Sequence, residues 1–183
     1  NSLKIKNLIR KSKKLEKKQK IQVGYNHRFH PSIIKALKGE SIPVYGNGSQ
    51  IRDWLYVDDH ACALVNVLYK GERMQTYNIG GNNEMRNIDV VKIICNILDK
   101  KNFNNKKCSS YTDLIEYVND RPGHDKRYAI DATKLNKELG WYPSVTFEQG
   151  LSKTIEWFLE NTDWLENVTT GSYQDYYNKQ YKE

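Results

Sequence analysis

Residues 42–60 read IPVYGNGSQIRDWLYVDDH, and this stretch indicates the fold because it passes from strand to turn to strand to helix. Its first four residues are extended, and Gly46-Asn-Gly48 has the composition of a turn. Residues 51–57 alternate apolar and polar side chains, which is typical of a half-buried strand. Asp58 and Asp59 then begin a helix, where the positive end of the helix dipole favours carboxylates. The stretch predicts a small α/β arrangement.

The segments on both sides continue this alternation of helices and strands. We expect helices over residues 32–38, 88–99 and 147–160, a short helix that Asp131 caps and Gly140 ends, and strands over residues 76–79 and 115–118.

Three of the helices carry specific local signals. In the helix that Asp58 begins, the spacing predicts a buried face made of Ala61, Leu64, Val65 and Leu68. Asn87 is a good N-cap for the next helix, whose expected apolar face is Ile88, Val91, Ile94, Cys95 and Leu98. Thr146, with Gln149 three residues later, has the pattern of a capping box.

The positive charge of the chain lies in its first 20 residues. They hold nine Lys or Arg and one acid, Glu16, whereas the rest of the chain holds 20 basic and 21 acidic residues. Such a run either binds nucleic acid or is a solvated arm, and we favour the arm because no aromatic residue is interleaved in it. We therefore expect a basic, disordered or frayed helical arm over residues 1–22 and one α/β domain over residues 23–183.

Composition also indicates the compartment. No stretch approaches the roughly 20 apolar residues that cross a bilayer, and the basic start has no apolar region after it, unlike a signal peptide. The three cysteines are too scattered for a disulfide framework or a metal site, and Cys62 and Cys95 fall in helical apolar patterns, as core side chains do. We expect a cytoplasmic protein. The chain does not begin with Met, which indicates a fragment or a processed product.

The common catalytic motifs do not occur in the sequence. Gly46-Asn-Gly48 precedes a strand instead of opening a helix, so it is not a dinucleotide fingerprint. None of the 13 tyrosines begins a Tyr-x-x-x-Lys pattern, and there is no Gly-x-Ser-x-Gly, His-Glu-x-x-His or Walker-type loop. We predict no catalytic, metal-binding or cofactor-binding residue in this chain.

Three polar groups remain as candidates for ligand binding. Arg52 has five donors that suit a phosphate, but it could equally form a structural pair with Asp53 or Asp59. Residues 120–125 (DRPGHD) form a turn whose Arg and His could donate to an anion, or they form an ordinary polar loop. Asn87 either caps its helix or marks a phosphate site at the helix N-terminus.

The same segments carry a resemblance to a known family. Residues 42–60, 76–84 (TYNIGGNNE), 87–91 (NIDVV) and 120–131 (DRPGHDKRYAID), together with Leu139-Gly-Trp141 and the tail from Asn161 to Gln174, resemble dTDP-glucose 4,6-dehydratase. The likeness covers about residues 29–183 in order. The Arg-Asp-Trp and Leu-Gly-Trp motifs are widespread in extended short-chain dehydrogenases acting on nucleotide sugars, and the DRPGHD segment with the Tyr-rich C-terminus points to the dTDP-glucose branch.

The resemblance implies a fold and a reaction. The fold is the small mixed α/β substrate-binding domain of an extended short-chain dehydrogenase, with the Rossmann half missing. The family is a lyase with bound NAD that oxidises the sugar at C4, eliminates water across C5–C6 and returns the hydride to C6. The product, dTDP-4-keto-6-deoxyglucose, belongs to nucleotide-sugar metabolism and dTDP-rhamnose biosynthesis. The resemblance further implies a dTDP-sugar ligand and, for the full-length enzyme, a homodimer.

It also implies substrate-binding residues at matching positions, which are Pro43, Tyr45, Arg52, Asn87, Arg121, His124 and Tyr181. The first two would pack near the thymine, and Arg52 would meet the diphosphate. Asn87, Arg121 and His124 would serve the nucleotide and its phosphates, while Tyr181 would close the site.

The chain departs from the family pattern at its start. The family's Gly-rich NAD loop, its Thr-Asp-Glu group and its Tyr-x-x-x-Lys lie upstream of the matched stretch, so we expect the chain alone to be inactive. Residues 24–31 (GYNHRFHP) replace the family's Asn-Asn-Tyr-Gly-Pro and Lys-Leu-Ile-Pro. Two alternatives stay open: a UDP-sugar decarboxylase or 4-epimerase of the same superfamily, and a non-catalytic module that binds nucleic acid or an acidic partner through the basic arm.

Overall fold

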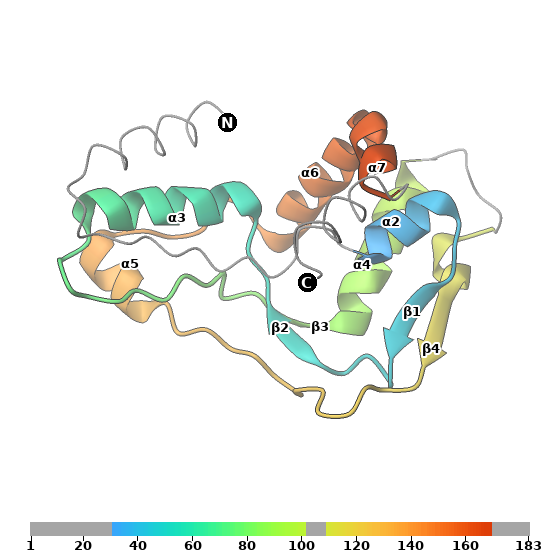
Figure 1. Ribbon diagram of the computed structural model, residues 1–183, viewed down its shortest axis with the longest axis horizontal. Coiled ribbons are helices and arrows are strands. Elements are labelled where there is room, and N and C mark those ends of the chain that lie inside the picture. Colours follow the sequence, from blue (N-terminus) through green and yellow to red (C-terminus); the bar gives the residue numbers. More distant parts are fainter. Residues whose placement is uncertain (1–30, 102–108, 170–183) are drawn as a thin grey trace, which may run out of the picture.

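The computed structural model describes residues 31–101 and 109–169, which form the expected mixed α/β fold (Figure 1). The elements in chain order are α2 (Pro31–Lys38), β1 (Ile42–Tyr45), β2 (Ile51–Asp53), α3 (Val57–Lys70), β3 (Glu84–Arg86), α4 (Asn87–Lys100), the 3-10 helix η1 (Tyr111–Leu114), β4 (Ile115–Val118), α5 (Thr133–Leu139), α6 (Phe147–Glu160) and α7 (Thr162–Thr169). The basic arm, Cys108 and Tyr181 lie outside the described residues.

The strands form two small sheets that the turn after β1 connects. β1 and β4 are parallel, with Ile42 opposite Ile115, and β2 is antiparallel to β3, with Arg52 opposite Met85. The loop after β4 then passes along the other edge of β2 (Figure 1). There Ile51 donates its N–H to the carbonyl of Lys126 at 2.8 Å and accepts from the N–H of Tyr128 at 3.0 Å. The loop between β4 and α5 is therefore fixed to β2 by backbone hydrogen bonds.

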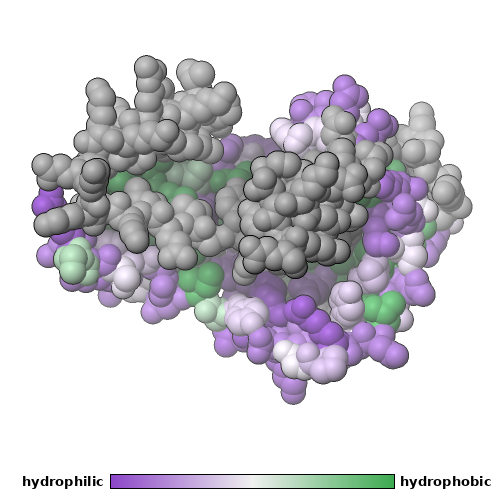
Figure 2. Space-filling view, in the orientation of Figure 1, coloured by the Kyte–Doolittle hydropathy of each residue, from purple (hydrophilic) through white to green (hydrophobic). Residues whose placement is uncertain are grey.

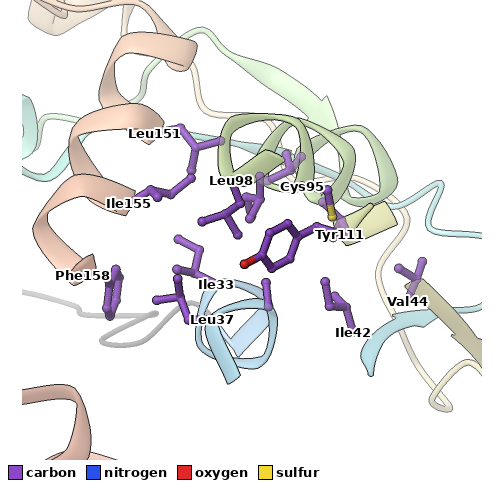
Figure 3. Close-up of a cluster of buried hydrophobic side chains, with 14 of the residues drawn as sticks. Ile33, Leu37, Ile42, Val44, Cys95, Leu98, Tyr111, Leu151, Ile155 and Phe158 are labelled. Atoms are coloured by element: carbon purple, nitrogen blue, oxygen red, sulfur yellow. The ribbon is translucent and has the colours of Figure 1, made fainter. Parts of the chain in front are cut away.

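The main core lies between α2, β1, α4, η1 and α6. The predicted apolar face of α4 is confirmed, because Ile88, Val91, Ile94, Cys95 and Leu98 are all buried. Figure 3 shows the fully buried ring of Tyr111 between α4 and α2, with Leu151, Ile155 and Phe158 of α6 beside it. This cluster holds the end of β1 and the start of α4 in place, next to the polar loops described below.

A second cluster joins α3 to α5 and corrects one prediction. Ala63 is fully buried against Leu135 and Leu139 of α5, whereas the predicted face of Ala61, Leu64, Val65 and Leu68 is only half-buried. The reason is that Asp59, one turn before Ala63, is buried by hydrogen bonds to Ser144 and Val145, which turns its own face of α3 inward.

Other local predictions were wrong for reasons of tertiary context. Residues 76–79 are not a strand, because β3 at residues 84–86 takes the edge of β2, and β2 ends at Asp53 instead of Val57. Asn87 is the first residue of α4, whose cap position is Arg86, and α4 has no side-chain cap hydrogen bond. Cys62 is exposed, while Cys95 is buried as expected.

Both ends of the short helix α5 follow the predicted signals with one shift. The cap position is Ala132, but the carboxylate of Asp131 accepts the N–H of Thr133 at 2.9 Å, and Gly140 ends the helix in the left-handed region (φ 63°). The helix over residues 32–38 is confirmed, with Gly39 after it.

The capping box at the start of α6 is confirmed and gives a first stability prediction. The Thr146 hydroxyl accepts the N–H of Gln149, and the Gln149 side chain accepts the N–H of Thr146. We expect Thr146→Ala to lower the free energy of unfolding by about 1 kcal/mol. The control is Thr154→Ala in the same helix, where the hydroxyl only donates back to the carbonyl of Gly150, and we expect a change below about 0.5 kcal/mol. Equal losses in thermal melts of the two variants would contradict the cap assignment.

Two kinds of feature are absent from the described ranges. None of their helices is long and apolar enough to pass through a lipid bilayer. They also contain no group of three His, Cys, Asp or Glu side chains that could hold a metal ion.

Candidate functional site

Three segments meet beside β2: the turn after β1, the loop after β4 and the first residue of α4. Gly46 lies in the left-handed region (φ 58°), and its N–H donates to the carbonyl of Val118 at 2.9 Å. Asn87 donates its backbone N–H to the carbonyl of Gln50 at 2.9 Å. The turn therefore connects to both neighbours through backbone bonds, so the side chains on the three segments have fixed starting points.

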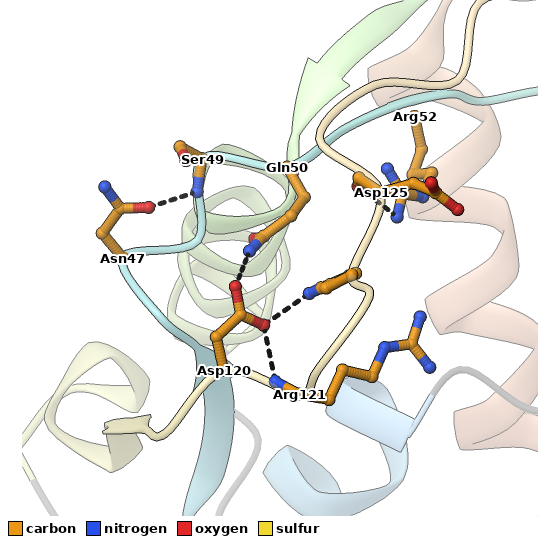
Figure 4. Close-up of polar contacts among 8 residues, drawn as sticks. Asn47, Ser49, Gln50, Arg52, Asp120, Arg121 and Asp125 are labelled. Atoms are coloured by element: carbon orange, nitrogen blue, oxygen red, sulfur yellow. Dashed lines mark hydrogen bonds and ion pairs between the residues drawn. The ribbon is translucent and has the colours of Figure 1, made fainter.

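The Asp120 carboxylate is the centre of a hydrogen-bond network between these segments (Figure 4). One oxygen faces Nδ1 of His124 at 2.6 Å and accepts the backbone N–H of Arg121 at 2.9 Å. The other accepts Nε2 of Gln50 at 2.8 Å. Gln50 is only 5% exposed and the His124 side chain 6%, so two of the partners are buried although Asp120 itself is partly exposed.

The network keeps Asp120 ionised. The hydrogen bond with His124 lowers the pKa of the Asp120 carboxyl below its ordinary value, and the Arg121 N–H and the Gln50 amide act in the same direction against the opposing effect of desolvation. Asp120 is therefore a fixed carboxylate whose lone pairs are directed at protein donors.

Arg52 is held by the loop that passes along β2. Its guanidinium donates to the carbonyl of Ile51 at 2.7 Å and to that of Asp125 at 3.0 Å, and it lies 4.5 Å above the centre of the Tyr128 ring. A cation on an aromatic face is stabilised by the ring electrons, which fixes its direction without neutralising its charge. Arg52 is therefore a positioned cation.

The alternative that Arg52 serves a structural ion pair is wrong. The Asp53 carboxylate accepts the backbone N–H groups of Gly81 at 2.8 Å and Asn83 at 2.7 Å. Asp59 binds the segment before α6 instead. Within residues 31–101 and 109–169, neither carboxylate pairs with Arg52, and the guanidinium meets only carbonyl oxygens and the ring.

Tyr128 brings the second arginine into the same region. Its hydroxyl donates to the Asp125 carboxylate, which raises the pKa of the Tyr128 phenol, while the charges of Arg52 and Arg121 act in the opposite direction. Arg52 lies over the Tyr128 ring, and Arg121 precedes Asp125 by four residues in the same loop. Figure 4 shows the Arg121 side chain extending away from Asp120, with Arg52 and Asp125 above it in this view. Arg121 forms no ion pair with any residue that the structure describes.

The outward face of β1 borders this region. Ile42 and Val44 point into the core, so Pro43 and Tyr45 lie on the other face of the strand. The Tyr45 ring is 47% exposed and meets the His124 ring edge-on, with 6.3 Å between their centres. An exposed aromatic face therefore adjoins the polar network.

The structure thus brings together most of the predicted site residues. Tyr45, Arg52, Arg121 and His124 are joined by direct contacts or through Asp120 and Tyr128, and Asn87 adjoins them through its backbone bond to Gln50. Pro43 has a neighbouring place on β1, and Tyr181 is outside the described residues.

Three further residues of the site were not predicted as such. Gln50, Asp120 and Tyr128 stand in or beside the quoted polar runs, but their roles depend on the docking of the loop on β2. The sequence holds one weak signal, an aromatic residue directly after Lys126 and Arg127.

The arrangement has the chemistry of an anion-binding surface. Two guanidinium groups without acidic partners in the described ranges and a histidine lie near an exposed aromatic ring, and charge-assisted hydrogen bonds from such groups suit phosphates. Figure 2 shows mainly hydrophilic residues along the lower edge, where β2 and the loop after β4 lie.

Comparison with known proteins gives a consistent result. A family model described as GDP-mannose 4,6 dehydratase matches residues 15–154. The dTDP-glucose 4,6-dehydratase of Shigella flexneri is 55% identical over 150 residues, which are 82% of this chain and 41% of that protein. The dTDP-glucose 4,6-dehydratase 1 of Escherichia coli (strain K12) is 54% identical with the same coverage. The chain thus spans about two fifths of the length of these curated relatives.

Solved structures agree with the sequence relatives. The dTDP-glucose 4,6-dehydratase of Bacillus anthracis, crystallised with NAD, has a TM-score of 0.64 at 42% identity, over 76% of this chain and 43% of that one. The dTDP-glucose 4,6-dehydratase of Streptomyces venezuelae has a TM-score of 0.66 at 33% identity, and the match covers 79% of this chain and 44% of that one. A UDP-glucose 4-epimerase of Thermotoga maritima is less similar. Its TM-score is 0.60 at 27% sequence identity, and the match covers 72% of this chain and 38% of that one.

Proposed function

Because the chain belongs to the family described as GDP-mannose 4,6 dehydratase, we propose that it forms the part of a dTDP-glucose 4,6-dehydratase that holds the nucleotide diphosphate of the substrate. The relatives with the higher identities are all named for that enzyme, and the UDP-glucose 4-epimerase is less similar, so a UDP-sugar enzyme is not favoured. A cytoplasmic location and a homodimeric full-length enzyme belong to the same proposal.

The observation that carries the proposal is Arg52, a positioned cation over the Tyr128 ring that is held by the loop in which Arg121 also lies. Arg52 and Arg121 come from segments far apart in the chain, the loop that carries Arg121 is bound to β2 through its backbone, and neither arginine has an acidic partner among the described residues. A diphosphate has the charge and the oxygen geometry that two guanidinium groups bind. Placed there, its two phosphates would neutralise two charges that have no acidic partner within residues 31–101 and 109–169.

The remaining predicted residues belong to the same proposal. His124 would donate to a phosphate, and Pro43 and Tyr45 would offer the outer face of β1 to the thymine. Asn87 begins α4 beside Gln50 and would serve the nucleotide, and Tyr181 would close the site from the C-terminal segment.

The turn at residues 46–48 does not fit NAD, which the solved structures from Bacillus anthracis and Streptomyces venezuelae hold. The turn at Gly46-Asn-Gly48 leads into β2, and a Cβ atom at Gly48 would lie 2.7 Å from Ile88 and Val44, so the space beside this glycine is filled by the core. The pyrophosphate of a dinucleotide needs an open glycine turn at the start of a helix. We therefore derive no hydride-transfer step from these residues, and the proposed reaction of the whole enzyme comes from the named relatives.

Replacing Arg52 tests the proposal directly. We expect Arg52→Ala to weaken dTDP binding about 10- to 100-fold, since a hydrogen bond to a charged group is worth roughly 1.5–3 kcal/mol. Thymidine has no diphosphate and should bind more weakly than dTDP. We expect its affinity to be the same for the unaltered chain and for Arg52→Ala. Calorimetry of the 183-residue chain with dTDP, UDP and thymidine measures these affinities.

The control is Arg127→Ala on the same loop. Arg127 is already paired with Glu84 through two contacts of 2.7 and 2.8 Å, so we expect dTDP affinity to change by less than about threefold. Equal losses in both variants would mean that only the net charge matters. Preference for UDP over dTDP, or no binding of dTDP to the unaltered chain, would overturn the proposal.

A further inference from the structure

The structure assigns a positioning role to Asp120: with Gln50 behind it, Asp120 fixes the imidazole of His124 so that Nε2 is the ring atom left for a phosphate of the nucleotide. This inference rests on the proposed function, because it names how one of the phosphate contacts is aligned. It concerns Asp120 and Gln50, which do not themselves contact the ligand.

The direction of the hydrogen bonds follows from the partners of Asp120. A backbone N–H and a side-chain amide nitrogen can only donate, so Asp120 accepts from both Arg121 and Gln50. A carboxylate with these donors accepts from Nδ1 of His124 as well, at 2.6 Å. In the neutral His124 ring the proton is therefore on Nδ1. A phosphate oxygen accepts hydrogen bonds, so the contact to the nucleotide is made by the ring with a second proton on Nε2, where Nδ1–H donates to Asp120 and Nε2–H donates to the phosphate. The hydrogen bond at Nδ1 leaves Nε2 as the other ring nitrogen, which makes no hydrogen bond to any of the described residues.

Gln50 shows that the network is more than a stabilising contact. Its Nε2 reaches Asp120, but its Oε1 is buried without a partner in the part of the chain that the structure describes. A buried acceptor without a donor costs free energy. Turning the amide over would not remove this cost, because Oε1 would then face the Asp120 carboxylate in place of Nε2. An apolar side chain of the same size would avoid this cost at a 5% exposed position. Gln50 therefore fixes the orientation of the Asp120 carboxylate, although its own unpaired Oε1 lowers the stability of the fold.

The three groups also connect separate parts of the fold. Gln50 precedes β2, whereas Asp120 and His124 lie 70 and 74 positions further on, in the loop after β4. The ring of Tyr45 adds an edge contact to His124 from β1. The imidazole is thus held directly by Asp120 and Tyr45, and Gln50 acts on it through Asp120, which together restrict the rotation of the ring.

Nitrogen NMR of the histidine rings tests the tautomer without any ligand. The chain has four histidines, and the loss of one set of signals in His124→Ala identifies the ring. At a pH where the ring is neutral, we expect the proton on Nδ1 in the unaltered chain and a shift toward Nε2 in Asp120→Ala. A proton on Nε2 in the unaltered chain, or an identical spectrum in the variant, would overturn the inference.

A double-mutant cycle with dTDP tests the positioning. If Asp120 acts through His124, Asp120→Ala should weaken binding several-fold in the unaltered chain, but the double variant should bind within about threefold of His124→Ala alone. Additive losses would show an independent structural effect and overturn the inference. Should His124→Ala itself bind dTDP normally, the phosphate contact in the proposed function fails, while the NMR result still decides the role of Asp120.

Gln50→Met provides a variant that is expected to fold. It removes the donor to Asp120 and also the buried acceptor without a partner, so we expect the melting temperature to fall by no more than about 2 °C while dTDP affinity falls several-fold. A large loss of stability with unchanged affinity would contradict a positioning role. Both readouts come from the complete 183-residue chain.

Discussion

Gly81→Ala is expected to lower the free energy of unfolding by about 3 kcal/mol, because a side chain at this position would push into the backbone. A Cβ atom on Gly81 would lie 2.1 Å from the carbonyl oxygen of Trp54. That oxygen cannot rotate away as a flexible side chain would. The chain around β2 would have to move, and the N–H groups of Gly81 and Asn83 would move away from the Asp53 carboxylate.

The same change should reach the candidate site. Asp53 follows Arg52 directly on β2, so a displaced turn at residues 81–83 alters the strand that positions the guanidinium. Thermal melting should show a fall of roughly 6–12 °C, given about 2–4 °C for each kcal/mol in a chain of this size. We also expect weaker dTDP binding at temperatures where the variant remains folded.

Gly140→Ala is the matched control. Gly140 ends α5 in the left-handed region at φ 63°, and a Cβ atom there would have no neighbour within 4 Å. Its replacement costs only the conformational strain of a non-glycine residue, about 1 kcal/mol. If the two variants melted at the same temperature, the close approach at Trp54 would not be the cause of the loss.

The local elements could be predicted from sequence because their signals lie within a few residues. The apolar face of α4 repeats at helical spacing, and the capping box of α6 needs only Thr146 and Gln149. Strand pairing is different, since the partner of β2 is chosen among distant segments. Residues 76–79 have strand-like composition, but β3 takes that place because Asp53 binds the turn just before it.

The candidate site was predictable in its residue types and not in its geometry. Arg52, Arg121 and His124 stand out because they combine donors with turn or strand positions. Their convergence depends on the docking of the loop after β4 on β2, through backbone bonds of Ile51 that any sequence could make. The buried contact from Gln50 to Asp120 joins residues 70 positions apart, and no spacing in the sequence indicates it.

The position of Asp59 at the start of a helix was predicted correctly, but its role in the structure differs from the predicted one. A carboxylate in the first turn of α3 was expected for its effect on the helix dipole. The structure buries it to 4% exposure, where one oxygen accepts the hydroxyl of Ser144 at 2.6 Å. The other accepts the backbone N–H groups of Ser144 at 3.1 Å and Val145 at 3.4 Å. Asp59 therefore joins α3 to the segment that enters α6.

Asp59→Ala is accordingly expected to lower the free energy of unfolding by about 3 kcal/mol, because it removes three hydrogen bonds to a charged group and leaves their donors without an acceptor. Asp89→Ala is the matched control, since Asp89 has the same third position in α4, a helix of the same length, and pairs only with the largely exposed Arg86. There we expect a loss of about 0.5 kcal/mol. Thermal melts of both variants separate the two explanations. Similar small losses of stability would mean that Asp59 acts on the helix dipole alone. A larger loss in Asp59→Ala would mean that Asp59 stabilises the junction with α6. Asp59→Asn should fall between them, because its amide keeps one acceptor oxygen but turns its NH₂ group toward N–H donors.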